Sequence, residues 1–183
     1  MQYYSTNGKA PIADLHKAVV KGLAEDRGLY MPQEIKKLPK VFFDNIHEMS
    51  FQQIAYNVAS AFFGEDVDLD ALQDIVYDTL SFDCPVVNVK DNIYSLELFH
   101  GPTLAFKDVG ARFMARLLQY FIRQEGLEQV NVLVATSGDT GSAVANGFLG
   151  VEGIHVYVLY PKGKVSPIQE CQFTTLGQNI TAI

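Results

Sequence analysis

The sequence predicts an α/β fold in which a parallel sheet with crossover helices is preceded by a helical N-terminal region. Two observations predict it. Residues 130–183 alternate short β-branched runs with helix-type patterns, an order that produces a parallel sheet. The first 80 or so residues instead carry three apolar stripes at helical spacing and no strand pattern. We therefore expect two regions, a helical one over residues 1–84 and the first part of an α/β domain over residues 85–183.

Three amphipathic helices are predicted in the N-terminal region. The first begins near Ile12 and gives way to a turn at Gly28 and Pro32, which break its apolar spacing. The second has Ser50 as its N-cap and ends at Gly64, and the third follows directly. Their apolar stripes are Ile12, Leu15, Val19 and Leu23; Phe51, Ile54, Ala55, Val58, Ala59 and Phe62; and Leu69, Leu72, Ile75, Val76 and Leu80.

A hairpin and a long helix are predicted next. Residues 86–89 and 93–99 are rich in β-branched and aromatic side chains and flank a polar turn, as two antiparallel strands do. The helix runs from about residue 107 to residue 124. Its apolar arc is so wide that we expect burial on more than one side.

The remaining residues predict a βαβαβ order. The strands are residues 130–135, 154–160 and a beginning strand at 179–183, and the helices between them are residues 142–149 and 166–176. The second helix has a full start signal, with Ser166 as N-cap, Pro167 at the first helical position and Gln169 placed to complete a capping box. Because the chain stops as a new strand begins, we expect these residues to be the front part of a longer protein.

Composition excludes several classes of protein. The 183 residues contain 14 Lys and Arg against 21 Asp and Glu, and the net charge of −7 excludes a duplex nucleic acid as partner. Cys84 and Cys171 lie far apart, with no metal-binding spacing, which indicates a reduced intracellular protein without a disulfide framework. No signal peptide and no run of eighteen apolar residues is present. We expect a cytoplasmic protein with no membrane partner and no metal site.

The glycine-rich loop at residues 135–143, A-T-S-G-D-T-G-S-A, is the first candidate site. It joins a strand to a helix, so it lies at the carboxyl end of a parallel strand, the usual ligand crevice. N–H groups of the helix start, together with the hydroxyls of Thr136, Ser137 and Thr140, suit an anion such as a carboxylate or phosphate. The alternative is a tight turn with helix-capping residues. The loop is neither a Walker A loop nor G-x-G-x-x-G.

Lys107 is the second candidate. It follows an apolar run and lies at the expected start of a helix, where burial and the helix dipole both favour the neutral amine. A neutral lysine amine is a nucleophile toward aldehydes. The alternative is a surface lysine paired with Asp108.

Four segments together resemble the threonine synthases. Residues 98–108, L-F-H-G-P-T-L-A-F-K-D, resemble the pyridoxal-phosphate lysine motif of that family, and residues 135–143 resemble its substrate loop. Residues 159–169, L-Y-P-K-G-K-V-S-P-I-Q, agree as well, and so do the opening segments Y-S-T-N-G and G-L-Y-M-P. The resemblance spans nearly the whole chain, with the motifs in the right order.

The resemblance implies a fold-type II pyridoxal-phosphate enzyme, a lyase that forms L-threonine and phosphate from O-phospho-L-homoserine and water. It implies that Lys107 holds pyridoxal 5'-phosphate and moves protons at the substrate carbons, and that Asp139 faces the cofactor. Lys162 or Lys164 is the candidate contact for the substrate phosphate. The implied substrate-binding residues are Thr136, Ser137, Gly138, Asp139, Thr140 and Gly141.

One departure from the family is important. The second glycine-rich loop, which in the family binds the cofactor phosphate, has no counterpart here. We therefore expect an N-terminal fragment that binds the cofactor weakly, is inactive alone and self-associates through exposed apolar surface. The alternative function is a non-catalytic α/β module that binds a small anion at residues 137–141.

Overall fold

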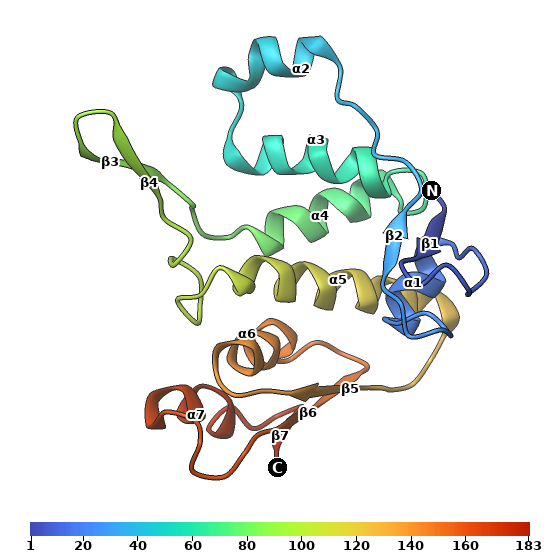
Figure 1. The fold of residues 1–183 in the computed structure, drawn as a ribbon, viewed down its shortest axis with the longest axis vertical. Coiled ribbons are helices and arrows are strands. Elements are labelled where there is room, and N and C mark those ends of the chain that lie inside the picture. The colour runs from blue at the N-terminus through green and yellow to red at the C-terminus, as the bar shows by residue number, and fades with distance from the viewer. The chain divides into compact units, whose positions relative to one another are not determined.

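The computed structural model describes residues 1–183, and the chain divides into two compact units, Met1–Leu80 and Ser81–Ile183. The elements of both are labelled in Figure 1.

The first unit contains the predicted helices and two features that were not predicted. In chain order its elements are β1 (Tyr3–Ser5), α1 (Leu15–Lys21), β2 (Tyr30–Pro32), α2 (Lys40–Asn45), the 3-10 helix η1 (Ile46–Glu48), α3 (Phe51–Phe63) and α4 (Leu69–Thr79). Ser50 caps α3, and Gly64 follows its last turn, as predicted. The expectation of helices alone was wrong, because β1 pairs antiparallel with β2 and α2 lies between β2 and α3. Strands of three residues are too short to show an alternating pattern.

A carboxylate fastens the loops around β1 and β2. Asp26 accepts hydrogen bonds from the Ser5 hydroxyl at 2.5 Å and from the backbone N–H groups of Lys9 and Ala10 at 2.9 Å and of Gly28 at 3.0 Å. The hydrogen bond from Ser5 is the largest cause that lowers the pKa of Asp26 to about 2, and the backbone donors lower it further. Asp26 thus joins two loops that are about twenty residues apart in the sequence.

The second unit begins with an exposed hairpin. Strands β3 (Val86–Lys90) and β4 (Ile93–Leu96) pair antiparallel, close to the predicted boundaries. No other element packs extensively against them, and Figure 1 shows the hairpin as a projecting arm. Its exposed apolar side chains are Val86, Val87, Val89, Ile93, Tyr94 and Leu96.

The rest of the second unit is the predicted α/β arrangement. Its elements are α5 (Lys107–Glu125), β5 (Val130–Ala135), α6 (Asp139–Phe148), β6 (Ile154–Leu159), α7 (Pro167–Thr174) and β7 (Ile180–Ala182). The three strands form one parallel sheet in the order β5-β6-β7, which confirms the predicted fold class. Its core includes Ala145 and Phe148 of α6, Val156 and Val158 of β6 and Phe173 of α7.

Close packing between α5 and α6 positions the site. Gly147 of α6 lies against the backbone of α5, where an added Cβ would be 2.9 Å from the carbonyl carbon of Ala111. Arg116 Nη1 donates to the carbonyl of Gly147 at 2.8 Å, which adds a polar contact between the same two helices. These contacts fix α5 beside α6 in the second unit.

Two details of the predicted helix starts differ. Helix α6 begins at Asp139, three residues before the predicted start. Ser166 caps α7 as predicted, but the reciprocal bond of the capping box does not form, because the Gln169 carboxamide is turned toward the loop before α6. The complete capping box is at Ser50 and Gln53.

No helix has the length and apolar character needed to cross a membrane. No group of three or more His, Cys, Asp or Glu side chains is arranged to hold a metal ion.

Candidate functional site

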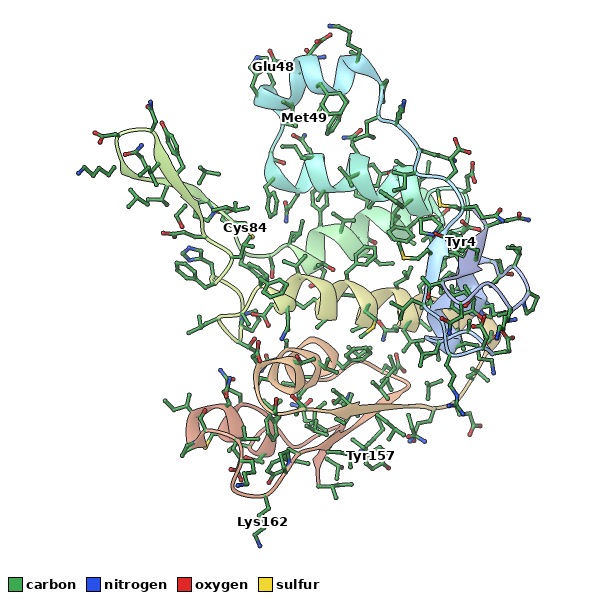
Figure 2. All side chains as sticks on the ribbon, viewed as in Figure 1. Tyr4, Glu48, Met49, Cys84, Tyr157 and Lys162 are labelled. Atoms are coloured by element: carbon green, nitrogen blue, oxygen red, sulfur yellow. The ribbon has the colours of Figure 1, made fainter.

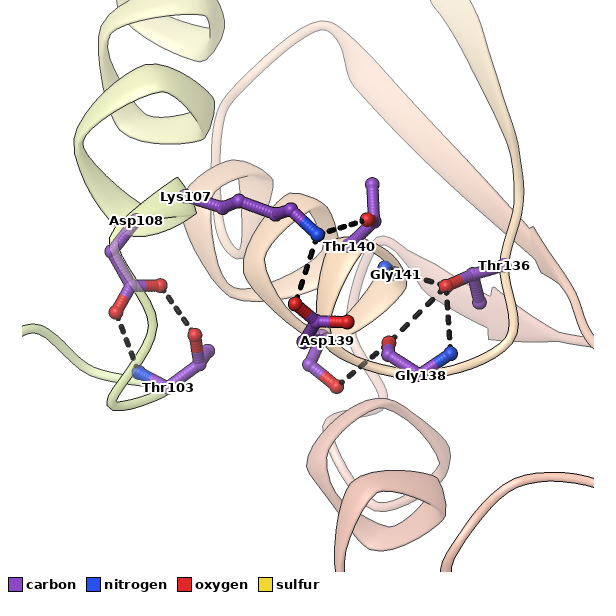
Figure 3. A network of polar contacts seen from close by, with 9 residues as sticks. Thr103, Lys107, Asp108, Thr136, Gly138, Asp139, Thr140 and Gly141 are labelled. Atoms are coloured by element: carbon purple, nitrogen blue, oxygen red, sulfur yellow. Dashed lines mark hydrogen bonds and ion pairs between the residues drawn. The ribbon is translucent and has the colours of Figure 1, made fainter. Parts of the chain in front are cut away.

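The lysine motif and the glycine-rich loop meet at the N-terminal ends of α5 and α6. Lys107 is the first residue of α5, and Asp139 and Thr140 are the first two residues of α6. Lys107 Nζ donates to Asp139 Oδ2 at 2.8 Å and to Thr140 Oγ1 at 2.8 Å (Figure 3). The structure therefore places an amine, a carboxylate and a hydroxyl within hydrogen-bond distance, from segments more than thirty residues apart.

Asp108 is an anchor for the turn before α5 and not the ion-pair partner of Lys107. Its carboxylate is buried, with 1% of the residue exposed, and it accepts from the N–H of Thr103 at 2.9 Å and from the hydroxyl of Thr103 at 2.6 Å. Gly101 is needed beside it, because an added Cβ would lie 2.5 Å from Asp108 Oδ2. The alternative of a surface Lys107–Asp108 pair is thus wrong.

Lys107 and Asp139 form an ion pair, and both side chains are partly exposed. A third of the Lys107 side chain is exposed and 56% of the Asp139 side chain. The hydrogen bond from Lys107 is the largest cause that lowers the pKa of the Asp139 carboxyl below its ordinary value. The sequence argument for a neutral amine depended on burial and on the helix dipole. In the structure a third of the side chain is exposed, and the amine lies beside a carboxylate.

The glycine-rich loop is held by the side chain of Thr136. Its Oγ1 accepts from the N–H of Gly138 at 3.1 Å and of Gly141 at 2.9 Å, and it donates to the carbonyl of Gly138 at 3.2 Å (Figure 3). Gly138 and Gly141 are buried, whereas Ser137, Asp139 and Thr140 are exposed. Of the six residues singled out in this loop, three are therefore engaged with one another and three face outward.

Gln169 belongs to this neighbourhood, although sequence reasoning treated it only as a helix cap. An added Cβ on Gly138 would lie 2.7 Å from Gln169 Oε1, so the carboxamide packs directly on the loop. The buried hydroxyl of Ser142 lies within 3.4 Å of the carbonyl oxygens of Gly138 and Gln169. The only sequence signal is the S-P-I-Q start of α7, which does not reveal what the helix packs against.

The two lysines suggested for the substrate phosphate lie on a separate loop. Lys162 and Lys164 are exposed on the loop between β6 and α7, and Lys162 points away from the ribbon (Figure 2). His100 pairs with Glu97 at 2.7 Å and stacks on Phe99.

The chain is similar to known proteins along its whole length. The family model described as threonine synthase N terminus matches residues 2–80. The chain is 39% identical over 183 residues to the threonine synthase of Escherichia coli and 41% identical over 183 residues to that of Serratia marcescens. Each match covers all of this chain and 42% of the relative. The chain therefore spans about two fifths of the length of these relatives.

Solved structures agree over the same length. A crystal structure of pyridoxal-phosphate-bound threonine synthase from Brucella melitensis has a TM-score of 0.92 at 37% identity and covers all of this chain and 40% of that one. The Escherichia coli threonine synthase structure has a TM-score of 0.90 at 39% identity, with 42% of that chain covered. In sequence and in fold, the chain matches the N-terminal portion of the threonine synthases along its full length.

Proposed function

We propose that this chain supplies the lysine and the substrate loop of a pyridoxal-phosphate-dependent threonine synthase. The enzyme is a lyase that converts O-phospho-L-homoserine and water to L-threonine and phosphate. The observation that carries the proposal is the placement of Lys107 Nζ 2.8 Å from both Asp139 and Thr140, within the two segments that resemble the family's motifs. We expect no turnover from the 183 residues alone, because they span about two fifths of the length of the threonine synthases that they match.

The residues present fit the cofactor's aldehyde. Lys107 offers a primary amine with a third of its side chain exposed, and its two partners are themselves exposed, so an aldehyde can reach it. When bound, pyridoxal phosphate supplies an electron sink for charge that develops on the substrate carbons. Lys107 would hold the cofactor through its amine, and the same amine would take and return a proton at those carbons.

The loop residues are assigned to orientation. Ser137 and Thr140 present hydroxyls beside the N-terminal end of α6, where the helix dipole favours a carboxylate. Asp139 is assigned to the cofactor, and this assignment requires Lys107 to leave its carboxylate when it reacts. The substrate phosphate is assigned to Lys162 or Lys164, whose ammonium groups are exposed.

The test is covalent trapping on the chain itself. Incubation with pyridoxal phosphate, reduction with borohydride and peptide mapping should place most of the label on Lys107. Lys107→Ala should lose that label, whereas Lys162→Ala, at an equally basic but exposed loop position, should retain it. Label distributed evenly over exposed lysines would contradict the proposal. No finding favours the alternative, a non-catalytic anion-binding module.

A further inference from the structure

The start of α6 lacks a side-chain cap of its own. Its N-cap residue is Gly138, which has no side chain, and the N–H of Gly141 is one of the donors that a helix start leaves without an intrahelical acceptor. The missing acceptor comes from Thr136, two residues before the cap, whose hydroxyl lies 2.9 Å from that N–H. The same hydroxyl also binds the N–H and the carbonyl of Gly138.

Thr136 is itself fixed to the sheet. Its N–H donates to the carbonyl of Leu159 at 2.9 Å and so continues the parallel pairing of β5 with β6. Its methyl group fills the space beside Gly141, where an added Cβ would be 2.2 Å from Thr136 Cγ2. The hydroxyl is therefore a fixed point between the rigid sheet and the loop.

We propose that Thr136 is a positioning residue, whose hydroxyl holds the loop so that Asp139 and Thr140 face Lys107. The N–H groups of Gly138 and Gly141 are used inside the loop, so the groups offered to a ligand are those of Ser137, Asp139 and Thr140. This replaces the expectation that Thr136, Gly138 and Gly141 contact the substrate themselves. The identity of the ligand depends on the proposed function, whereas the positioning of the loop is a property of this chain alone.

A matched pair of variants separates the hydroxyl from the methyl group. Thr136→Val keeps the shape and removes the hydroxyl, and Thr136→Ser keeps the hydroxyl and removes the methyl. In the 183-residue chain without cofactor, Thr136→Val should speed amide hydrogen exchange at Gly138 and Gly141 by roughly five- to tenfold, because their acceptor is lost. Thr136→Ser should exchange at the wild-type rate. Unchanged exchange in Thr136→Val would overturn the proposal.

A second readout reports on the ion pair. The pKa of the Asp139 carboxyl, measured by NMR titration, should return toward its ordinary value in Thr136→Val and stay lowered in Thr136→Ser. If Thr136→Val also exposes amides of β5 and β6 by unfolding, Thr136→Ser decides: wild-type exchange supports the proposal, and exchange as fast as in Thr136→Val overturns it. Absence of label on Lys107 in the wild-type chain would overturn the proposed function and leave both of these readouts unchanged.

Discussion

Lys107 and Asp108 are adjacent in the sequence but have different environments. Successive helical residues point about 100° apart, so Asp108 turns inward to Thr103 while Lys107 reaches across to α6. The turn that precedes them contains Leu104 at φ +59°, a conformation that is unfavourable for a bulky side chain. The local turn therefore determines which of the two charges is buried and which is available.

Replacing Asp139 tests the ion pair. Asp139→Asn should change the free energy of unfolding by less than about 1 kcal/mol, because both side chains are partly exposed and screened. It should increase the rate at which a small amine-modifying reagent, added without cofactor, labels Lys107 by about two- to fivefold, since the amine loses its carboxylate partner. Because the pKa of Asp139 is lowered on folding, the wild-type ion pair is complete above about pH 4 and is lost as the pH falls further. Slower reaction of Lys107 with that reagent in the variant than in wild type would contradict this role.

Two glycines make a matched test of packing. Gly141→Ala should destabilise the chain by about 1–3 kcal/mol, because the new Cβ meets the branched Thr136 side chain, which hydrogen bonds hold in place. Gly110→Ala, inside α5 with nothing within 4 Å of the new Cβ, should stabilise by about 0.5–1 kcal/mol. Denaturant unfolding measures both changes. Equal effects of the two variants would show that the loop tolerates a side chain at Gly141.

Helices α3 and α7 both begin with S-x-x-Q, but the glutamine makes different contacts in each. Gln53 is exposed, and its Oε1 accepts a hydrogen bond from the N–H of Ser50 at 2.8 Å. Gln169 accepts instead from the Ser166 hydroxyl at 3.1 Å and packs on Gly138. The cap at Ser166 therefore also fixes α7 against the loop, which couples the start of one helix to the start of another.

The loops around β1 and β2 should be sensitive to acid. Asp26 has a pKa lowered to about 2 in the folded chain, against an unfolded value of about 4, so its contribution to stability is complete above about pH 4 and is lost as the pH falls to 2. Asp26→Asn should therefore lower the melting temperature at pH 6 and flatten its dependence on pH between 4 and 2. Melting curves at several pH values measure this. An unchanged slope in the variant would show that other carboxyls cause the loss.

For the molecule as a whole, the exposed hairpin predicts self-association. A two-stranded hairpin with apolar side chains on its surface has free edges and nothing covering it. The wild-type chain should sediment above the monomer mass at high concentration. Val89→Thr with Ile93→Thr, at positions 64% and 63% exposed, should shift it toward monomer while keeping strand propensity. Val41→Thr, at an exposed position of α2, is the control and should leave the mass unchanged.

The sequence predicted those parts of the molecule that local patterns determine. The boundaries of β5, the start of α5 at Lys107 and the cap of α3 at Ser50 follow from periodicity, β-branched runs and capping residues. The pairing of β1 with β2 and the contact between Gln169 and Gly138 depend on segments that meet only after folding. The same holds for the choice of Asp139 over Asp108 as the neighbour of Lys107.

The contact between Lys107 and Asp139 also gives a way to follow folding over time. The two residues are 32 positions apart and begin α5 and α6, so their side chains meet once these two helices have docked. A brief pulse of an amine-modifying reagent at successive times of refolding should find Lys107 reactive at first and slower once it meets the carboxylate. The lysine assigned to chemistry thus serves as an intrinsic reporter of when this unit assembles.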